Sequence, residues 1–247
     1  GRHPEEMAED WDNVGLLVGD DEREITHVFL TLDLTEETLE QALSAGANMI
    51  VSHHPMIFSG MKKINNHTFT GRKVLRLIES QIPYYAMHTN YDICGMADHN
   101  AACLGLQNTR PVSVTEVQTG QGLGRIGSLP KEMTLLACGE YVKKSCEIDE
   151  VRIYGDPGRT IRTMAICSGS GKSLIPDALR AGVDVYVTGD IDHHSGIDAV
   201  AQGLCVIDAG HYGTEYIFMK DMKAEIAEAF PGLTVTCEII QKPYLLL

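Results

Sequence analysis

The sequence is poor in basic residues and lacks long apolar runs, and each shortage excludes a class of protein. It contains 20 Lys and Arg residues and 34 Asp and Glu residues, which gives a formal net charge of −14. Because nucleic-acid binding draws much of its affinity from cations that neutralise phosphates, this balance disfavours a DNA or RNA partner. No stretch approaches the roughly 20 apolar residues that a bilayer-spanning helix needs, so we expect a soluble globular protein without a membrane partner.

Paired cysteines of the CxxC type are also missing. The seven cysteines are odd in number and sit largely in apolar contexts, which is typical of small buried hydrophobic residues. We therefore expect a reducing, cytoplasmic compartment. The sequence opens at Gly1 without an initiator Met or the apolar stretch of a secretory signal, so we expect the natural chain to begin before Gly1.

What is present is an alternation of short apolar runs with helical stretches. Such alternation is typical of βαβ units around mostly parallel sheets. We predict an α/β fold of two related lobes, residues 1–125 and 126–247, that together form one compact unit. Strands are predicted at 27–32, 48–51, 83–87, 162–167, 185–188 and 205–208. Helices are predicted at 36–45, at 72–80, up to Arg180, up to Gln202 and at 214–230.

Two eight-residue segments, 45–52 and 181–188, align with each other and indicate an internal duplication. In each segment a helix ends on an Ala-Gly pair, a strand follows, and polar residues come directly after the strand. His88 and His211 form a second pairing, each after a later strand. Because α/β folds bind ligands at the carboxyl ends of parallel strands, we expect the functional residues there. Chance similarity between the two segments is the alternative.

Two glycine-rich motifs lack the context that their usual functions require. The segment Gly122–Gly127 spells a dinucleotide fingerprint, but Ser128, Leu129 and Pro130 follow where a helix must open. The segment Gly169–Ser173 resembles the end of a P-loop, but Ile166 stands where its first glycine is required. Backbone N–H groups of this second turn could still hold a substrate phosphate, and an ordinary βα loop is the alternative.

Histidines and carboxylates follow three of the predicted elements. His53 and His54 come directly after a buried strand, and Asp92 lies in a polar loop after the next one. His211 and Glu215 are four residues apart at the start of the final helix, so they share one helix face. Each has a simpler explanation taken alone: a capping or hydrogen-bonding role for the histidine pair, a turn for Asp92, and helix-dipole stabilisation for Glu215.

Taken together, three histidines and two carboxylates predict a site for two divalent metal ions. Mixed imidazole and carboxylate sets suit such cations, and five ligands exceed the three or four that one catalytic zinc uses. We expect Glu215 to bridge the two ions. Asp190 and His194 belong to a second polar cluster, and either could orient a metal ligand or shuttle a proton in catalysis, with structural hydrogen bonding as the alternative.

One combination of motifs extends along the chain: Trp11–Leu16, Ser52–Pro55, Gly122–Gly127, Thr188–Asp190, Gly210, His211 and Glu215. With this combination the sequence resembles the NIF-three-like family, also called GTP cyclohydrolase I type 2 homologues, over essentially its whole length. The resemblance implies two related α/β lobes with a dinuclear site between them, and it matches His53, His54, Asp92, His211 and Glu215 to the family's ligands. It also implies a toroidal homohexamer, in a short form without the inserted middle domain.

The sequence leaves three hypotheses of function. The leading hypothesis is a metal-dependent hydrolase of a small nucleotide-like or phosphorylated substrate, using Zn, Fe, Mn or Co, because a pair of metal ions can acidify water and stabilise attacking and leaving oxygens. A phosphoester, an amide or a purine ring carbon would all suit such a site. The alternative is a non-catalytic, metal-binding regulatory or interaction protein. Clamping of nucleic acid by a ring is a third hypothesis, and the acidic charge disfavours it.

Overall fold

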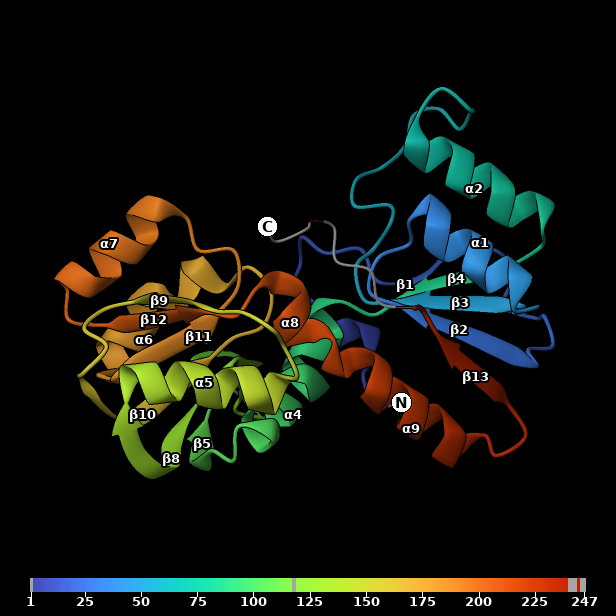
Figure 1. The fold of residues 1–247 in the computed structure, drawn as a ribbon. Coiled ribbons are helices and arrows are strands. Elements are labelled where there is room, and N and C mark those ends of the chain that lie inside the picture. The colour runs from blue at the N-terminus through green and yellow to red at the C-terminus, as the bar shows by residue number, and fades with distance from the viewer. Residues whose placement is uncertain (1, 117–118, 240–243, 245–247) are drawn as a thin grey trace. The chain divides into compact units, whose positions relative to one another are not determined.

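The computed structural model describes residues 2–116, 119–239 and 244, and it divides into two compact units (Figure 1). The first unit combines residues 1–91 with the segment from Phe218 onward, and the second unit comprises residues 92–217. Each unit is built on its own main sheet. The α/β class and the mostly parallel pairing predicted for the strands are confirmed.

The sheet of the first unit has five strands in the order β1-β4-β3-β2-β13. The pairings β4 with β3, β3 with β2 and β2 with β13 are parallel, and only β1 with β4 is antiparallel. The elements of this unit are η1 (Glu5–Met7), β1 (Gly15–Val18), β2 (His27–Thr31), α1 (Glu36–Ser44), β3 (Met49–Ser52), α2 (Phe69–Glu79), β4 (Tyr84–Ala86), α3 (Thr89–Tyr91), α9 (Ile217–Ala229) and β13 (Thr234–Cys237).

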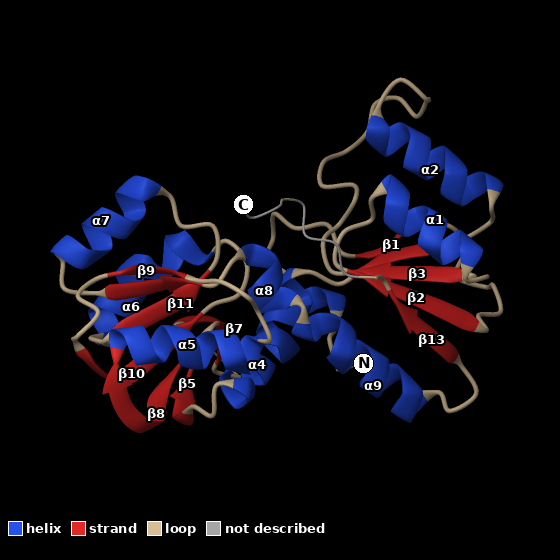
Figure 2. Ribbon diagram, in the orientation of Figure 1, coloured by secondary structure: helices blue, strands red, loops and turns tan. Residues whose placement is uncertain are grey.

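Helices α1 and α2 cover one face of this sheet and α9 lies on the other (Figure 2). Leu39 and Ala42 of α1 and Leu77 of α2 pack with Phe29 and Ile50 of the strands in one buried cluster. Successive strand residues point to opposite faces, so strands covered on both sides must be apolar throughout. This explains the unbroken apolar runs from which the strands were predicted.

The second unit contains a six-stranded sheet in the order β5-β8-β10-β11-β12-β9, in which β10, β11 and β12 are parallel neighbours and the outer pairings are antiparallel. A small hairpin, β6 with β7, accompanies it. The elements are η2 (Asp92–Met96), α4 (Ala97–Cys103), β5 (Gln107–Arg110), β6 (Ser113–Glu116), β7 (Gln121–Leu123), β8 (Arg125–Thr134), α5 (Leu135–Cys146), β9 (Arg152–Tyr154), β10 (Thr160–Ile166), η3 (Gly171–Leu174), α6 (Ile175–Ala181), β11 (Val185–Thr188), α7 (His193–Ala201), β12 (Cys205–Asp208) and α8 (His211–Glu215).

Two buried clusters lie on opposite faces of this second sheet. Val185 and Val187 of β11 pack in the cluster that includes α5, whereas Tyr186 packs in the cluster that includes α6 and α7. The alternation within one strand follows from the two-residue period of side chains along a β-strand. The three parallel strands are therefore held between two layers of helices.

The predicted elements occur where they were expected, with two differences in organisation. The final helix is divided at Tyr216 into α8 and α9 rather than running unbroken. The unit boundaries also differ from the predicted lobes 1–125 and 126–247, because β13 pairs with β2 in the first sheet and residues 92–125 contribute α4 and β5 to the second unit. A boundary at a single point in the chain cannot include a strand that returns from its far end.

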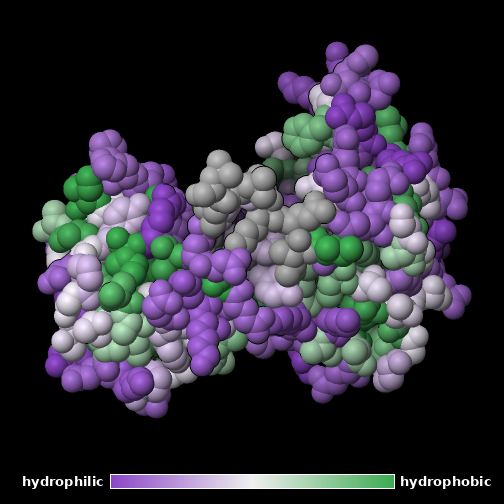
Figure 3. Space-filling model, viewed as in Figure 1, coloured by the Kyte–Doolittle hydropathy of each residue, from purple (hydrophilic) through white to green (hydrophobic). Residues whose placement is uncertain are grey.

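Among the described residues, none of the helices combines the length and apolar character needed to cross a membrane. Hydrophilic residues cover much of the visible face of each unit, with smaller hydrophobic patches between them (Figure 3). This distribution agrees with the charged, acidic composition of the chain.

Candidate metal centre

Three histidines gather at the carboxyl end of the first sheet. His53 and His54 directly follow β3, and His88 comes two residues after the end of β4. One ring nitrogen from each lies within 4.8 Å of the others, a group that could hold a metal ion. The sequence produces this group because β3 and β4 are parallel neighbours, so the residues that follow them emerge at the same edge.

Each of these imidazoles is held through its Nδ1 atom. Nδ1 lies 2.8 Å from the carbonyl oxygen of Met87 in His53, 3.0 Å from Asp33 Oδ1 in His54, and 2.9 Å from Asp12 Oδ1 in His88. Carbonyl and carboxylate oxygens only accept hydrogen bonds, so Nδ1 carries the proton in all three neutral rings. Nε2 is then the nitrogen with the lone pair, which is the arrangement found in metal-ligating histidines.

Asp12 is the buried anchor of the His88 loop. Its side chain is fully buried, and besides His88 it accepts hydrogen bonds from the backbone N–H and the hydroxyl of Thr89 at 3.0 and 2.6 Å. Burial alone would raise the pKa of Asp12, but the hydrogen bonds from His88 and Thr89 outweigh it and hold the pKa well below its usual range. Asp12 is therefore a fixed negative charge behind the imidazole.

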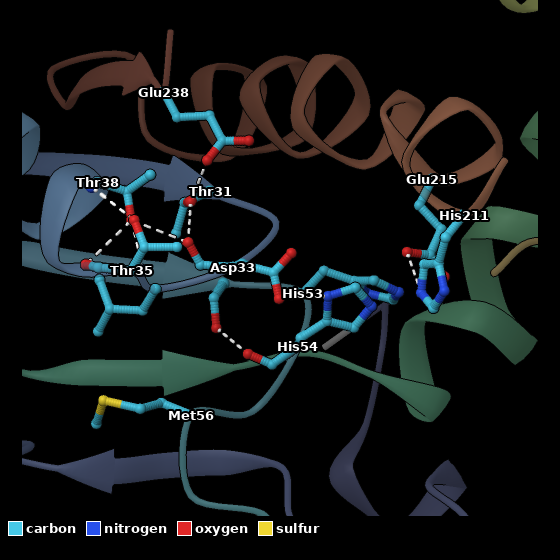
Figure 4. A network of polar contacts seen from close by, with 12 residues as sticks. Thr31, Asp33, Thr35, Thr38, His53, His54, Met56, His211, Glu215 and Glu238 are labelled. Carbon is cyan, nitrogen blue, oxygen red and sulfur yellow. Dashed lines mark hydrogen bonds and ion pairs between the residues drawn. The ribbon is translucent and has the colours of Figure 1, made fainter. Parts of the chain in front are cut away.

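Asp33 is held through its backbone at the start of α1. Its carbonyl oxygen accepts hydrogen bonds from the hydroxyls of Thr31 and Thr38 at 2.8 and 2.9 Å and from the Thr35 N–H at 3.0 Å. Thr35 and Thr38 also form a reciprocal capping box at the helix start. In Figure 4 the Asp33 side chain lies beside the His53 and His54 rings, at the end of strands β2 and β3. The buried Lys73 donates to the neighbouring carbonyl of Leu34.

The second unit contributes carboxylates and one further histidine. His211 and Glu215 lie on α8, with His211 Nε2 3.2 Å from Glu215 Oε2 (Figure 4). Glu215 is 3% exposed, and a carboxylate oxygen of Asp92 lies within 4.8 Å of one of Glu215. Asp92 opens the π-helical segment η2, a rare backbone form that is frequent at functional sites. Burial, together with the nearby charges of Asp92 and Glu215, raises the pKa of the Cys167 thiol to about 12.

A carboxylate holds Nδ1 in this unit too. Asp190 Oδ2 lies 2.7 Å from His211 Nδ1, and Asp190 adopts a left-handed conformation with φ of 56°. Asp208 at the end of β12 fixes the adjoining backbone, because its carboxylate accepts the N–H groups of Ile191 and Gly210 at 3.0 Å each. Asp208 is buried and also bound by Arg152. The strained Asp190 is therefore held in place from both sides.

The glycine-rich turn after β10 serves this cluster by allowing close approach. A Cβ atom at Gly169 would lie 2.3 Å from Glu215 Oε1 and 3.3 Å from His211 Nε2, so only glycine fits there. The Gly169 N–H donates to the Thr214 hydroxyl at 2.9 Å, next to Glu215. This packing accounts for the first glycine of the P-loop-like motif without a phosphate.

The structure thus places the five predicted ligands in two groups, one in each unit. His53 and His54 lie together with His88, and Asp92, His211 and Glu215 lie together in the other unit. The predicted catalytic residues are also in the second unit. Asp190 contacts His211, whereas His194 is exposed in the first turn of α7 with its ring 5.3 Å from that of His193.

Sequence reasoning missed the residues that position the ligands. Asp33, Asp12 and Asp208 hold the ligand-bearing loops, and none of them was a candidate. The only available signal was their position: Asp33 and Asp208 follow or end a predicted strand, as the predicted ligands do. His88 was noted as a residue at a strand end but was not assigned to the metal set.

The comparisons with known proteins identify the family of this chain. A model of the family described as Duf34/NIF3 (NGG1p interacting factor 3) matches residues 2–243. The chain belongs to the DUF34/NIF3 family. A relative from Clostridium perfringens with the name GTP cyclohydrolase 1 type 2 homolog is 36% identical over 227 residues, covering 91% of this chain and 87% of the relative.

Solved structures of DUF34/NIF3-like proteins share the fold. A hypothetical protein of Staphylococcus aureus is 30% identical, covers 100% of this chain and 95% of its own, and superposes with a TM-score of 0.91. The reduced form of HcgD from Methanocaldococcus jannaschii, also 30% identical, covers 95% of this chain and 92% of its own with a TM-score of 0.80. The predicted family membership is confirmed.

Proposed function

We propose that this DUF34/NIF3 protein binds two divalent metal ions through His53, His54, Asp92, His211 and Glu215, and that it hydrolyses a small nucleotide-like or phosphorylated substrate. One observation carries the proposal: the Nδ1 atom of every histidine in this set is bound by a carboxylate or carbonyl oxygen. Histidines held in this way are oriented to offer Nε2 to a cation, and neither a buried structural role nor a surface role requires it three times over.

The donor set suits the proposed ions. Imidazole nitrogens combined with carboxylate oxygens favour Zn, Fe, Mn or Co over soft thiophilic ions, and five ligands are more than a single tetrahedral ion uses. The proposal assigns all five to one dinuclear centre, with the buried Glu215 as the bridging carboxylate. His88 lies close enough to His53 and His54 to serve beside them.

A pair of divalent cations would supply Lewis acidity and a means of generating hydroxide near neutral pH. The protein's own side chains would orient the metal ligands and transfer protons. Asp33 and Asp190 fix the rings of His54 and His211, and Asp190 holds the Nδ1 proton of its histidine at 2.7 Å. We propose Asp190 for the catalytic positioning of His211 and His194 for proton transfer to or from solvent, since His194 is exposed at the start of α7.

The names of the relative and of the family support two different functions for this centre. The name GTP cyclohydrolase 1 type 2 homolog favours hydrolysis of a nucleotide-like substrate. The family description, NGG1p interacting factor 3, favours the alternative of a non-catalytic, metal-binding regulatory or interaction protein. The seven free cysteines support a reducing, cytoplasmic location, and assembly as a toroidal homohexamer remains part of the proposal.

The experiment measures metal content and turnover on the same samples. Protein purified without a chelator or affinity tag is expected to hold about two divalent ions per chain by elemental analysis. It is then assayed on phosphoester, nucleotide and amide substrates with Mn, Zn, Fe and Co, next to the His211→Ala and Glu215→Ala variants. Turnover that survives unchanged in either variant contradicts the hydrolase, and bound metal without turnover selects the regulatory alternative.

A further inference from the structure

Two exposed aromatic rings lie together beside the histidine group of the first unit. Trp11 is 58% exposed and Phe58 is 52% exposed, although large apolar rings are usually covered. Their ring centroids are 5.9 Å apart and the planes differ by 23°, an offset-stacked arrangement. Trp11 is also the single tryptophan of the chain. We call Trp11 and Phe58 the aromatic pair.

The aromatic pair is held by polar contacts on both sides. Asp12, next to Trp11, is fixed by its bonds to His88 and Thr89 described above. Asn13 donates from Nδ2 to the carbonyl of Ile57 at 2.6 Å, which ties the Trp11 segment to the loop that carries Phe58. The Met56 N–H on that loop donates to the Tyr84 hydroxyl at 2.8 Å. Hydrogen bonds therefore fix both of the segments that carry the exposed rings.

The aromatic pair lies beside the proposed metal ligands of the first unit. The His88 ring meets Trp11 edge-on at 5.9 Å and Phe58 edge-on at 6.0 Å, and the same ring lies 5.5 Å from His54. A single imidazole therefore separates the aromatic pair from the proposed metal ligands. All these residues belong to the first unit.

We propose that the aromatic pair is a binding site for the planar heterocyclic ring of a nucleotide-like small molecule, which stacks on Trp11 and Phe58 with its phosphate directed toward His54 and His88. Stacking on aromatic side chains accepts any base, since every base has a π-face. A divalent cation held by His54 would attract the phosphate to this side of the aromatic pair. The direction of the phosphate rests on the proposed function, whereas the stacking does not.

The single tryptophan makes the test direct. Full-length protein is titrated with guanosine monophosphate and with adenosine monophosphate while the emission of Trp11 is recorded, first after removal of metal by a chelator and then with added Mn²⁺. Saturable quenching by both nucleotides is expected, and ribose phosphate, which has no base, is expected to cause none. The Phe58→Ala variant, which keeps the fluorophore, is expected to bind roughly 10- to 100-fold more weakly.

The matched control is Phe230→Ala, which removes another exposed ring of the same unit, 62% exposed, and is expected to leave the titration unchanged. Quenching by ribose phosphate equal to that by the nucleotides, or equal affinity in Phe58→Ala, overturns the proposal. So does a Trp11 emission that shifts with protein concentration in the absence of nucleotide, because a second copy would then cover the rings.

The two proposals fail separately in this design. Quenching in protein that binds no ions even after Mn²⁺ is added supports the stacking site and contradicts the metal centre. Protein that holds its ions but shows no quenching contradicts the stacking site alone. Tighter binding of the nucleotides with Mn²⁺ than without it is the result expected when both are correct.

Discussion

In the first unit, strands β1, β4, β3 and β2 lie side by side in that order, with one antiparallel pairing followed by two parallel ones. In the second unit, β9, β12, β11 and β10 repeat both the order and the directions. The likeness extends to single residues. Asn48 Oδ1 accepts the N–H groups of Thr26 and His27, and Asp184 Oδ2 in the second unit accepts those of Arg162 and Thr163.

The carboxyl ends of these matching strands differ in chemistry. The first unit presents His53, His54 and His88, whereas the second presents Asp190 after β11 and, on α8 after β12, His211 and Glu215. One backbone plan thus yields an imidazole-rich edge and a carboxylate-rich edge. The shared strand order therefore determines where the functional side chains emerge. The few residues after each strand determine which ligands those side chains can bind.

The largest effect is expected from the residue that anchors the second edge. Asp208→Ala removes the acceptor of the buried Ile191 N–H and the part-buried Gly210 N–H, at about 1–3 kcal/mol each, so the free energy of unfolding should fall by about 3 kcal/mol. Urea unfolding followed by circular dichroism measures it. The control Asp198→Ala removes an exposed carboxylate of α7 and should change stability by under about 0.5 kcal/mol. Equal midpoints in the two variants would show that Asp208 is no anchor.

A smaller effect is expected from the carboxylates that orient the histidines. Asp33→Asn in the first unit and Asp190→Asn in the second replace a pure acceptor by an amide that can also donate, so the histidine tautomer is no longer fixed. Each should weaken metal binding roughly 10- to 100-fold, measured by competition with a chelating dye. Asp198→Asn is the matched control. If only one of the two variants weakens metal binding, only the histidines of that unit bind the ions.

The smallest effect separates Asn48 from Asp184 by pH. Burial tends to raise the pKa of Asp184, but hydrogen bonds from Arg162 and Thr163 outweigh it and lower the pKa. Asp184 therefore stabilises the fold above its unfolded pKa of about 3.9, and this contribution is lost as pH falls through the lower folded value.

Exchanging the two residues should exchange this acid sensitivity. Asp184→Asn should lose the acid-dependent part of its stability, and Asn48→Asp should gain one in the first unit, each below about 1 kcal/mol because both positions are partly exposed to solvent. Thermal unfolding between neutral pH and about pH 3 measures the difference. Parallel pH profiles for the natural protein and Asp184→Asn would contradict the assignment.

The sequence predicted the central strands and helices because their patterns are local. Strands covered on both faces are continuous apolar runs, and the spacing of His211 and Glu215 follows from the helical period alone. Strand β5 was missed because its four residues are polar and exposed, so no hydrophobic pattern distinguishes it from a loop. Strand β13 was missed because its position depends on a pairing with the distant β2.

The residues that position the histidines could not be predicted from the sequence, for the same reason. Asp12 and Asp33 look like ordinary turn residues, and their role depends on contacts with histidines 76 and 21 positions away in the chain. Local patterns carry no information on such pairs. The residues alone predicted the five metal ligands, and the family resemblance implied the same five.

Strand β13 has a consequence for how this protein is made. It completes the first sheet beside β2, and Glu238 just after it binds Thr31, 207 positions earlier in the chain. During synthesis the second unit, which is continuous, emerges whole while the first still lacks its edge strand. Because domains tend to fold as they leave the ribosome, the histidine-bearing unit must wait with an open sheet edge until β13 has also been synthesised.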